Sequence, residues 1–157
     1  MGLPVLQPVM QYGQGATRKW ELQSWFVHAP QAVTAPAVAL SPGDEITSFM
    51  QYDAANEEWT VSATNLATGE DSTLTISKQK LGGYDFDWGM LVCETIKKDG
   101  QCESLPADDA GLTFTNVTLD GGAVTWTTRE GLSDCAEDVE VVDDSGDQVK
   151  MTWSYAR

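Results

Sequence analysis

Hydrophobic and polar residues alternate along much of this chain, and runs with helical spacing are hard to find. Side chains of a β-strand point to opposite faces in turn, so such alternation predicts strands with one buried face. Clusters of Gly, Pro, Asp and Asn between these runs supply turn residues. The pattern predicts eleven short strands, at Val5 to Tyr12, Lys19 to His28, Ala37 to Leu40, Ile46 to Tyr52, Glu58 to Thr64, Ser72 to Ser77, Phe86 to Ile96, Leu112 to Leu119, Ala123 to Thr128, Asp138 to Val142 and Gln148 to Tyr155.

This series of strands predicts an all-β fold, a two-sheet antiparallel β-sandwich or jelly roll. Many short strands separated by turn residues are typical of such folds, because each strand buries one face against the facing sheet. The chain has 157 residues, which is enough for one domain with its own core. We therefore expect a single β-sandwich domain over residues 1–157.

Strand parity places polar side chains together on the first two predicted strands. Gln7 and Gln11 point to the same side of the first strand. Glu21, Gln23 and Trp25 share one side of the second. A sheet face that carries amides, an acid and an indole is a candidate surface for a polar ligand.

An acidic residue also falls in the apolar run near the middle of the chain. On a strand, Glu94 shares a face with Val92 and Ile96. A carboxyl group among apolar neighbours is either a hydrogen-bonded structural group or one whose pKa is tuned for chemistry. Glu94 is therefore a candidate for either role.

The charge of the chain limits its partners. There are 24 acidic and 9 basic residues, which give a formal net charge of −15. Nucleic-acid binding depends largely on Lys and Arg that neutralise phosphates, so we expect no nucleic-acid partner, and anionic membrane surfaces are disfavoured for the same reason. The apolar start of the chain is interrupted by Pro4, Gln7 and Pro8, which is typical of neither a membrane span nor a signal-peptide core.

Three cysteines allow at most one intramolecular bridge and leave one thiol. Cys102 and Cys135 have polar surroundings suited to a surface disulfide, whereas Cys93 lies in an apolar run and is interpreted as a buried thiol. A disulfide between Cys93 and Cys102 is the competing possibility.

With no CxxC spacing and one histidine, His28, we expect no metal and no cofactor. We expect the mature form of a secreted, extracellular protein whose signal peptide has been removed.

Several segments, taken in order, carry a resemblance to a known family. They are Val5 to Gln11, Ser24 to Phe26, Val38 to Ile46, Thr60 to Asn65 with Gly69, and Val92 to Thr95. Together they resemble the fungal glutamic peptidases, or eqolisins. The chain is more similar still to fungal and bacterial proteins of that fold with the motifs LQPVLQ, SWY and PGD. The resemblance extends from about residue 4 to residue 104 and is weaker beyond.

The resemblance implies a concanavalin A-like sandwich in which one curved sheet forms a concave polar groove. In the peptidases, a glutamine and a glutamate in this groove activate water and stabilise the tetrahedral intermediate. The glutamine motif matches Gln7, and the glutamate motif best matches Glu94, with Asp87 as a second alignment. A carboxylate can accept the proton of water while an amide donates to an oxyanion.

The sequence departs from the family pattern in three places. Gln11 stands where the peptidases carry an acid four residues after the glutamine, and Trp25 to His28 stand where they carry Trp-Tyr-Glu-Trp. The peptidases also have further strands before the glutamine strand. We therefore expect a homodimer or a second chain to complete the sandwich.

Two hypotheses follow for the function. The first, which the sequence favours, is a non-enzymatic, lectin-like module that binds a glycan or another polar ligand on a concave sheet. Its ligand-binding residues would be Gln7, Gln11, Glu21, Gln23, Trp25 and Glu94. The second is an acid endopeptidase that acts on polypeptides with Gln7 and Glu94 as catalytic residues.

Overall fold

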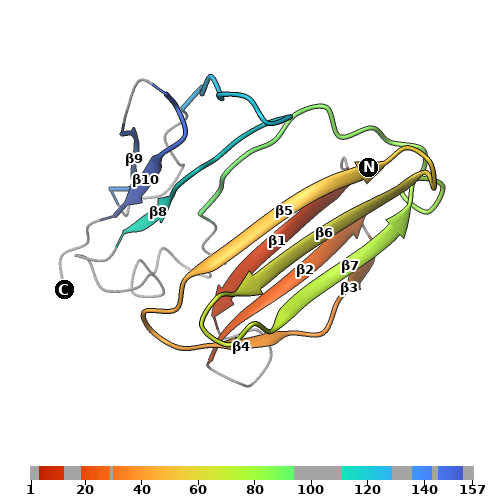
Figure 1. Ribbon diagram of the computed structural model, residues 1–157, viewed down its shortest axis with the longest axis horizontal. Coiled ribbons are helices and arrows are strands. Elements are labelled where there is room, and N and C mark those ends of the chain that lie inside the picture. Colours follow the sequence, from red (N-terminus) through yellow and green to blue (C-terminus); the bar gives the residue numbers. More distant parts are fainter. Residues whose placement is uncertain are drawn as a thin grey trace. The chain divides into compact units, whose positions relative to one another are not determined.

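The computed structural model describes residues 4–12, 19–28, 30–93, 111–128, 136–142 and 145–153. All regular elements within these ranges are β-strands, as Figure 1 shows. The chain divides into two compact units, Met1–Gly89 and Met90–Arg157, which are described separately below. The expectation that residues 1–157 form one domain stays a prediction.

The first unit contains seven strands in two antiparallel sheets. In one sheet, β1 pairs with β2, β2 pairs with β3, and β4 pairs with the start of β2. In the other sheet the order is β5-β6-β7. The strands are β1 (Val5–Tyr12), β2 (Trp20–His28), β3 (Gln31–Thr34), β4 (Val38–Leu40), β5 (Ile46–Asp53), β6 (Glu58–Asn65) and β7 (Asp71–Ser77).

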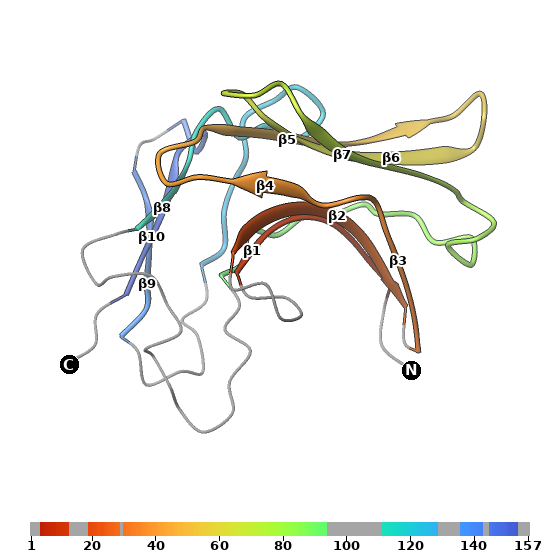
Figure 2. The same cartoon turned by 90° about the horizontal axis from the view of Figure 1, so that it is seen from below.

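The two sheets of the first unit pack face to face around an apolar core. One core cluster joins β1 and β2 to β6, β7 and the turn that follows, with the buried residues Leu6, Phe26, Val61, Ile76 and Leu81. A second cluster comprises Leu22, Val38 and Ala63. The sheet of β1, β2 and β3 is curved, and its concave side faces away from β5, β6 and β7 (Figure 2). The predicted fold class, an all-β antiparallel sandwich, is confirmed.

Two serines connect the sheets by hydrogen bonds. The backbone N–H of Ser24 in β2 donates to Ser72 Oγ at 3.0 Å, and Ser24 Oγ donates to the Ser72 carbonyl oxygen in β7 at 2.7 Å. Neither serine is exposed to solvent. Most buried polar groups are hydrogen-bonded, because an unpaired one loses its contact with water without compensation. This pair therefore fixes β2 against β7.

Ser24 also lies at the point along β2 where the strand that pairs with it changes from β3 to β4. β3 pairs with β2 from Trp25 onward and β4 pairs with it up to Leu22, so residues 35–37 between them leave the ladder. Across this gap, the Ala35 N–H donates to the Ser24 carbonyl oxygen at 3.0 Å. On the other side, Ser24 is in register with Pro8, which has no N–H.

The turn of the PGD motif is tied to the turn between β6 and β7. Asp44 Oδ2 accepts hydrogen bonds from the Ser41 N–H at 2.9 Å and from Asn65 Nδ2 at 2.7 Å. Asn65 is fully buried, and its Oδ1 accepts the N–H of Ala67. Gly43, before Asp44, has a φ of 93°, a conformation that favours glycine. The motif thus has a structural role in this chain.

The second unit contains a small antiparallel sheet of the order β8-β10-β9. Its strands are β8 (Leu112–Phe114), β9 (Asp138–Val141) and β10 (Val149–Thr152). Val149, Met151 and Trp153 are its most buried apolar residues in the described ranges. A Cβ at Gly146 would lie 2.2 Å from the Val124 carbonyl oxygen, so this position requires glycine.

Some of the predicted strands are wrong. The described part of Phe86 to Ile96 is irregular, because no described strand pairs with it and Gly89 interrupts its run of side chains. Residues 123–128 are also irregular, and there the Trp126 indole N–H donates to the Gly146 carbonyl oxygen at 2.6 Å instead. The strand predicted from Leu112 to Leu119 ends at Phe114, shortly before Asn116, whose φ is 56°.

One strand was not predicted, and the remaining strands differ from the predictions only near their ends. The missed strand β3 has four residues and lies between Pro30 and Pro36, which resemble turn residues in the sequence.

We expect removal of either serine hydroxyl to destabilise the first unit. Ser72→Ala leaves the Ser24 N–H without an acceptor, and Ser24→Ala leaves the Ser72 carbonyl without its donor. An unsatisfied buried group costs about 1–3 kcal/mol, which urea denaturation would measure. Ser48→Ala is the matched control, because the Ser48 side chain is exposed and its hydroxyl forms no hydrogen bond with another described side chain or backbone group. Equal stabilities of Ser72→Ala and Ser48→Ala would contradict the assigned role.

Candidate binding face on β1 and β2

Five of the predicted ligand-binding residues lie on one face of the β1–β2 pair. The register places Gln7 opposite Trp25, and Gln11 opposite Glu21, with Gln23 between them on the same face of β2. Leu6 and Phe26, which have the opposite parity, belong to the core between the sheets. The five residues therefore occupy the concave side of the curved sheet, the side that faces away from β5, β6 and β7 (Figure 2).

Two of these residues form a chain of side-chain amides. Gln11 Nε2 donates to Gln23 Oε1 at 3.0 Å, and Gln23 Nε2 donates to the Ala35 carbonyl oxygen at 2.7 Å. Gln11 is buried, and Ala35 lies just beyond β3. The chain connects β1, β2 and the segment that leaves the ladder between β3 and β4. Gln11 and Gln23 thus support the floor of the face through these two hydrogen bonds.

Gln7 and Trp25 are arranged differently. Gln7 is half-buried, and its carboxamide has no hydrogen bond to any other described residue. Trp25 Nε1 is buried and has no acceptor among the described residues. Buried indole N–H groups usually find a partner. The two cross-strand neighbours therefore present donors that are not used within the described part of the chain.

The indole N–H of Trp59 is also buried and has no acceptor in the described ranges. Its surroundings are aromatic, because its ring lies 5.3 Å from each of the rings of Tyr52 and Phe86. This cluster packs against the core between the sheets. Trp59 therefore lies apart from the concave face.

The acid on the concave face lies away from the indole. Glu21 and Trp25 are four residues apart on β2, so their backbone positions are separated by about 13 Å. Glu21 is half-buried and forms no ion pair within the described residues. The acid and the indole are thus too far apart to contact one small ligand, although an extended ligand can contact both.

β3 contributes a further residue that the sequence analysis missed. Thr34 is in register with Trp25 and shares the concave face with it. The strand that carries Thr34, Gln31–Thr34, is short and lies between two prolines, so its sequence resembles a loop. Gln7, Trp25 and Thr34 therefore form one row across β1, β2 and β3.

The predicted carboxylate partner of Gln7 lies outside the described residues. This applies to Glu94, and also to Cys102 and Cys135, the predicted disulfide. The second alignment of the glutamate motif, Asp87, is exposed on the irregular segment after β7. The pairing of Gln7 with a carboxylate therefore stays a prediction.

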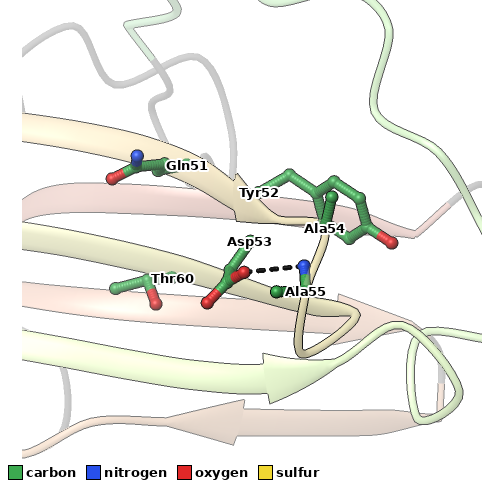
Figure 3. A pocket seen from close by; sticks show the side chains of 6 residues that line it. All are labelled: Gln51, Tyr52, Asp53, Ala54, Ala55 and Thr60. Carbon is green, nitrogen blue, oxygen red and sulfur yellow. Dashed lines mark hydrogen bonds between the residues drawn. The ribbon is translucent and has the colours of Figure 1, made fainter.

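A surface hollow of about 430 Å³ lies at the turn between β5 and β6 (Figure 3). Its residues include Gln51 and Thr60 on neighbouring strands and Asp53 at the turn. Asp53 accepts hydrogen bonds from Asn56 Nδ2 and from the N–H groups of Ala55 and Asn56. The Asn56 side chain, followed by these backbone donors, lowers the pKa of Asp53. Its carboxylate thus serves to hold the turn.

Within the described residues, no group of three or more His, Cys, Asp or Glu side chains is placed to hold a metal ion. None of the described segments forms a helix long and apolar enough to cross a membrane.

Comparisons with known proteins gave one structural similarity. No protein-family model matches the chain, and no curated protein matches it. Among solved structures, the chain is similar to the crystal structure of aspergilloglutamic peptidase from Aspergillus niger, with 21% identity and a TM-score of 0.48. The match covers 96% of this chain and 87% of that chain.

Cys93 carries a free thiol in the second unit and is half-buried. Partial burial raises the pKa of this thiol, and the negative charge of Glu137 raises it further. Only the thiolate is strongly nucleophilic, so a raised pKa lowers reactivity at neutral pH.

We expect Cys93 to react slowly with iodoacetamide at neutral pH and faster as the pH rises above the usual range of thiol pKa values. Glu137→Gln should shift the rate profile to lower pH, because it removes the negative charge near the thiol. Peptide-level mass spectrometry separates the labelling of Cys93 from that of the other two cysteines. Glu140→Gln, which removes the same charge at an exposed position of β9, is the control. A profile that is unchanged in Glu137→Gln would contradict this electrostatic explanation.

Proposed function

We propose that the concave face of β1 and β2 binds an extended polypeptide and that the protein is a glutamic-type acid endopeptidase. The observation that carries the proposal is the cross-strand pair of Gln7 and Trp25, whose side-chain N–H groups have no acceptor among the described residues. Peptide carbonyl oxygens are acceptors of the kind that such donors require. A polypeptide offers a carbonyl group at each residue, so it can supply an acceptor to each donor once the buried indole nitrogen of Trp25 is uncovered.

The spacing of the face also favours an extended ligand. Side chains on one face of β2 repeat about every 6.6 Å, and those of a bound extended polypeptide repeat at the same interval. Trp25, Gln23 and Glu21 are three successive positions of this kind. A ligand in extended conformation along β2 would therefore meet each of them with alternate residues.

The proposed chemistry assigns one role to each catalytic side chain. The Gln7 amide would donate to the oxygen that becomes negative as water attacks the peptide carbonyl. Glu94 would accept the proton of that water and return it to the leaving amine. The basis for the pair is the sequence resemblance to the glutamic peptidases together with the position of Gln7 on the concave face. Low pH suits a chain with a net charge of −15, because protonation of carboxylates relieves their repulsion.

We expect the protein to cleave a denatured protein substrate at about pH 3, where carboxylate repulsion is reduced. Loss of an oxyanion donor in Gln7→Ala should lower kcat by about 100-fold or more, and Glu94→Ala should lower it at least as far. The assay follows the release of new amino termini over time. Gln51→Ala, which changes an exposed glutamine of β5 in the other sheet, is the matched control.

Two outcomes would contradict this proposal. Absence of cleavage by the wild-type protein would exclude the peptidase. Cleavage that persists in both Gln7→Ala and Glu94→Ala would show that another site performs the reaction. Circular dichroism of each variant separates loss of catalysis from loss of fold.

A non-enzymatic, lectin-like module is the second candidate, and the composition of the concave face favours it. An indole, amide groups and a carboxylate can together contact the apolar face and the hydroxyl groups of a sugar. The distance between Trp25 and Glu21 requires an oligosaccharide, since one sugar ring cannot contact both.

If this candidate is right, a glycan array should show binding of oligosaccharides by the wild-type protein. Trp25→Ala should abolish that binding, because it removes the aromatic ring that stacks on the sugar. Trp88→Ala is a control, since Trp88 is exposed on the irregular segment after β7. An array without binding would leave the lectin-like candidate without support, and binding that Trp25→Ala retains would exclude the concave face as its site.

A further inference from the structure

We propose that Glu21 makes the concave face selective for polypeptides that carry a lysine or an arginine. This inference rests on the proposed function, because it assumes that the face binds a polypeptide. It adds the class of substrate and the residue that selects it.

Glu21 is the charged side chain of the described concave face. Its neighbours on this face are uncharged, with Gln11 opposite it in β1 and Ala39 opposite it in β4. Farther along the face lie Val9, Gln23 and Trp25. A single negative charge among amides and apolar groups makes the electrostatic potential of the face negative at the end where Glu21 lies.

The carboxylate of Glu21 is available to a ligand. No ion pair joins it to a basic side chain within the described ranges. Lys19, the described basic residue nearest to it along the chain, is exposed and makes no ion pair with it. The Gln11 amide opposite it donates to Gln23 instead. A cation from a ligand would therefore meet an acid that the described residues leave uncompensated.

The surroundings of Glu21 strengthen such a pair relative to a fully exposed one. Glu21 is half-buried, and a partly buried ion pair is less screened by solvent and salt than a surface pair. The net charge of −15 adds a long-range attraction for cationic ligands. Local position and overall charge thus favour the same kind of ligand.

The register gives the position of the selected residue. Along β2, Trp25 and Glu21 are two same-face positions apart, with Gln23 between them. An extended polypeptide has the same side-chain repeat. The lysine or arginine should therefore lie four residues from the ligand residue that faces Trp25.

The experiment uses the full chain and synthetic peptides in matched pairs. Each pair carries, at one position, either lysine or norleucine, which has a similar length and no charge. The dissociation constant is measured by fluorescence anisotropy at near-neutral pH, where carboxylates and lysines are charged and an acid endopeptidase is slow. Moving the lysine along the peptide locates the preferred position. Glu21→Gln removes the charge with little change of shape, and Glu70→Gln removes one charge at an exposed turn of the other sheet.

We expect the wild-type protein and Glu70→Gln to bind the lysine peptide about two- to fivefold more tightly than the norleucine peptide, or more if burial strengthens the pair. In Glu21→Gln this ratio should fall to about one while the norleucine peptide keeps its affinity. Added salt should reduce the ratio in the wild-type protein.

The outcomes separate the two proposals. If the wild-type protein binds both peptides equally, or if the lysine preference persists in Glu21→Gln, the role of Glu21 is overturned and the polypeptide-binding face stands. If no peptide binds, the proposed function fails and this inference fails with it.

Discussion

The two hydrogen bonds between Ser24 and Ser72 fix the position of β2, and the rest of the first unit is arranged around that strand. β2 pairs with β1 on one side and with β3 and β4 on the other. One face of β2 contributes Leu22 and Phe26 to the core, and the other contributes Glu21, Gln23 and Trp25 to the concave face. The constraint that positions β2 in the core thus also positions the candidate site.

The amide chain of Gln11 and Gln23 has a related role on the opposite side of β2. It connects β1 to β2 and reaches the Ala35 carbonyl, where the chain passes from β3 toward β4. The gap in the ladder is therefore closed by two hydrogen bonds of Ala35, one from the Gln23 side chain on the concave side and one to the backbone carbonyl oxygen of Ser24. Among the five residues placed on this face, Gln7, Trp25 and Glu21 have side-chain polar groups without a partner in the described part of the chain.

The sequence was a better guide to which face of a strand each side chain occupies than to which residues of neighbouring strands contact one another. Alternation was sufficient to place Gln7, Gln11, Glu21, Gln23 and Trp25 on one face, because parity depends only on local geometry. The hydrogen bond between Gln11 and Gln23 could not be predicted, because it depends on the register of two strands that a loop connects. The strand predicted from Phe86 to Ile96, whose described part is irregular, was misjudged for a similar reason, since strand propensity does not provide a pairing partner. β3 was missed because four residues between two prolines carry little periodic signal.

The resemblance to the glutamic peptidases was carried partly by Ser24 and by the PGD turn, and the structure gives both a purely architectural function. Ser24 joins the sheets, and Asp44 ties two turns together through Asn65. Neither interaction involves the groups that would bind or cleave a substrate. Either motif can therefore stabilise a sandwich that has a different catalytic acid or none. A motif that maintains a scaffold is evidence of that scaffold, and a scaffold alone does not determine an activity.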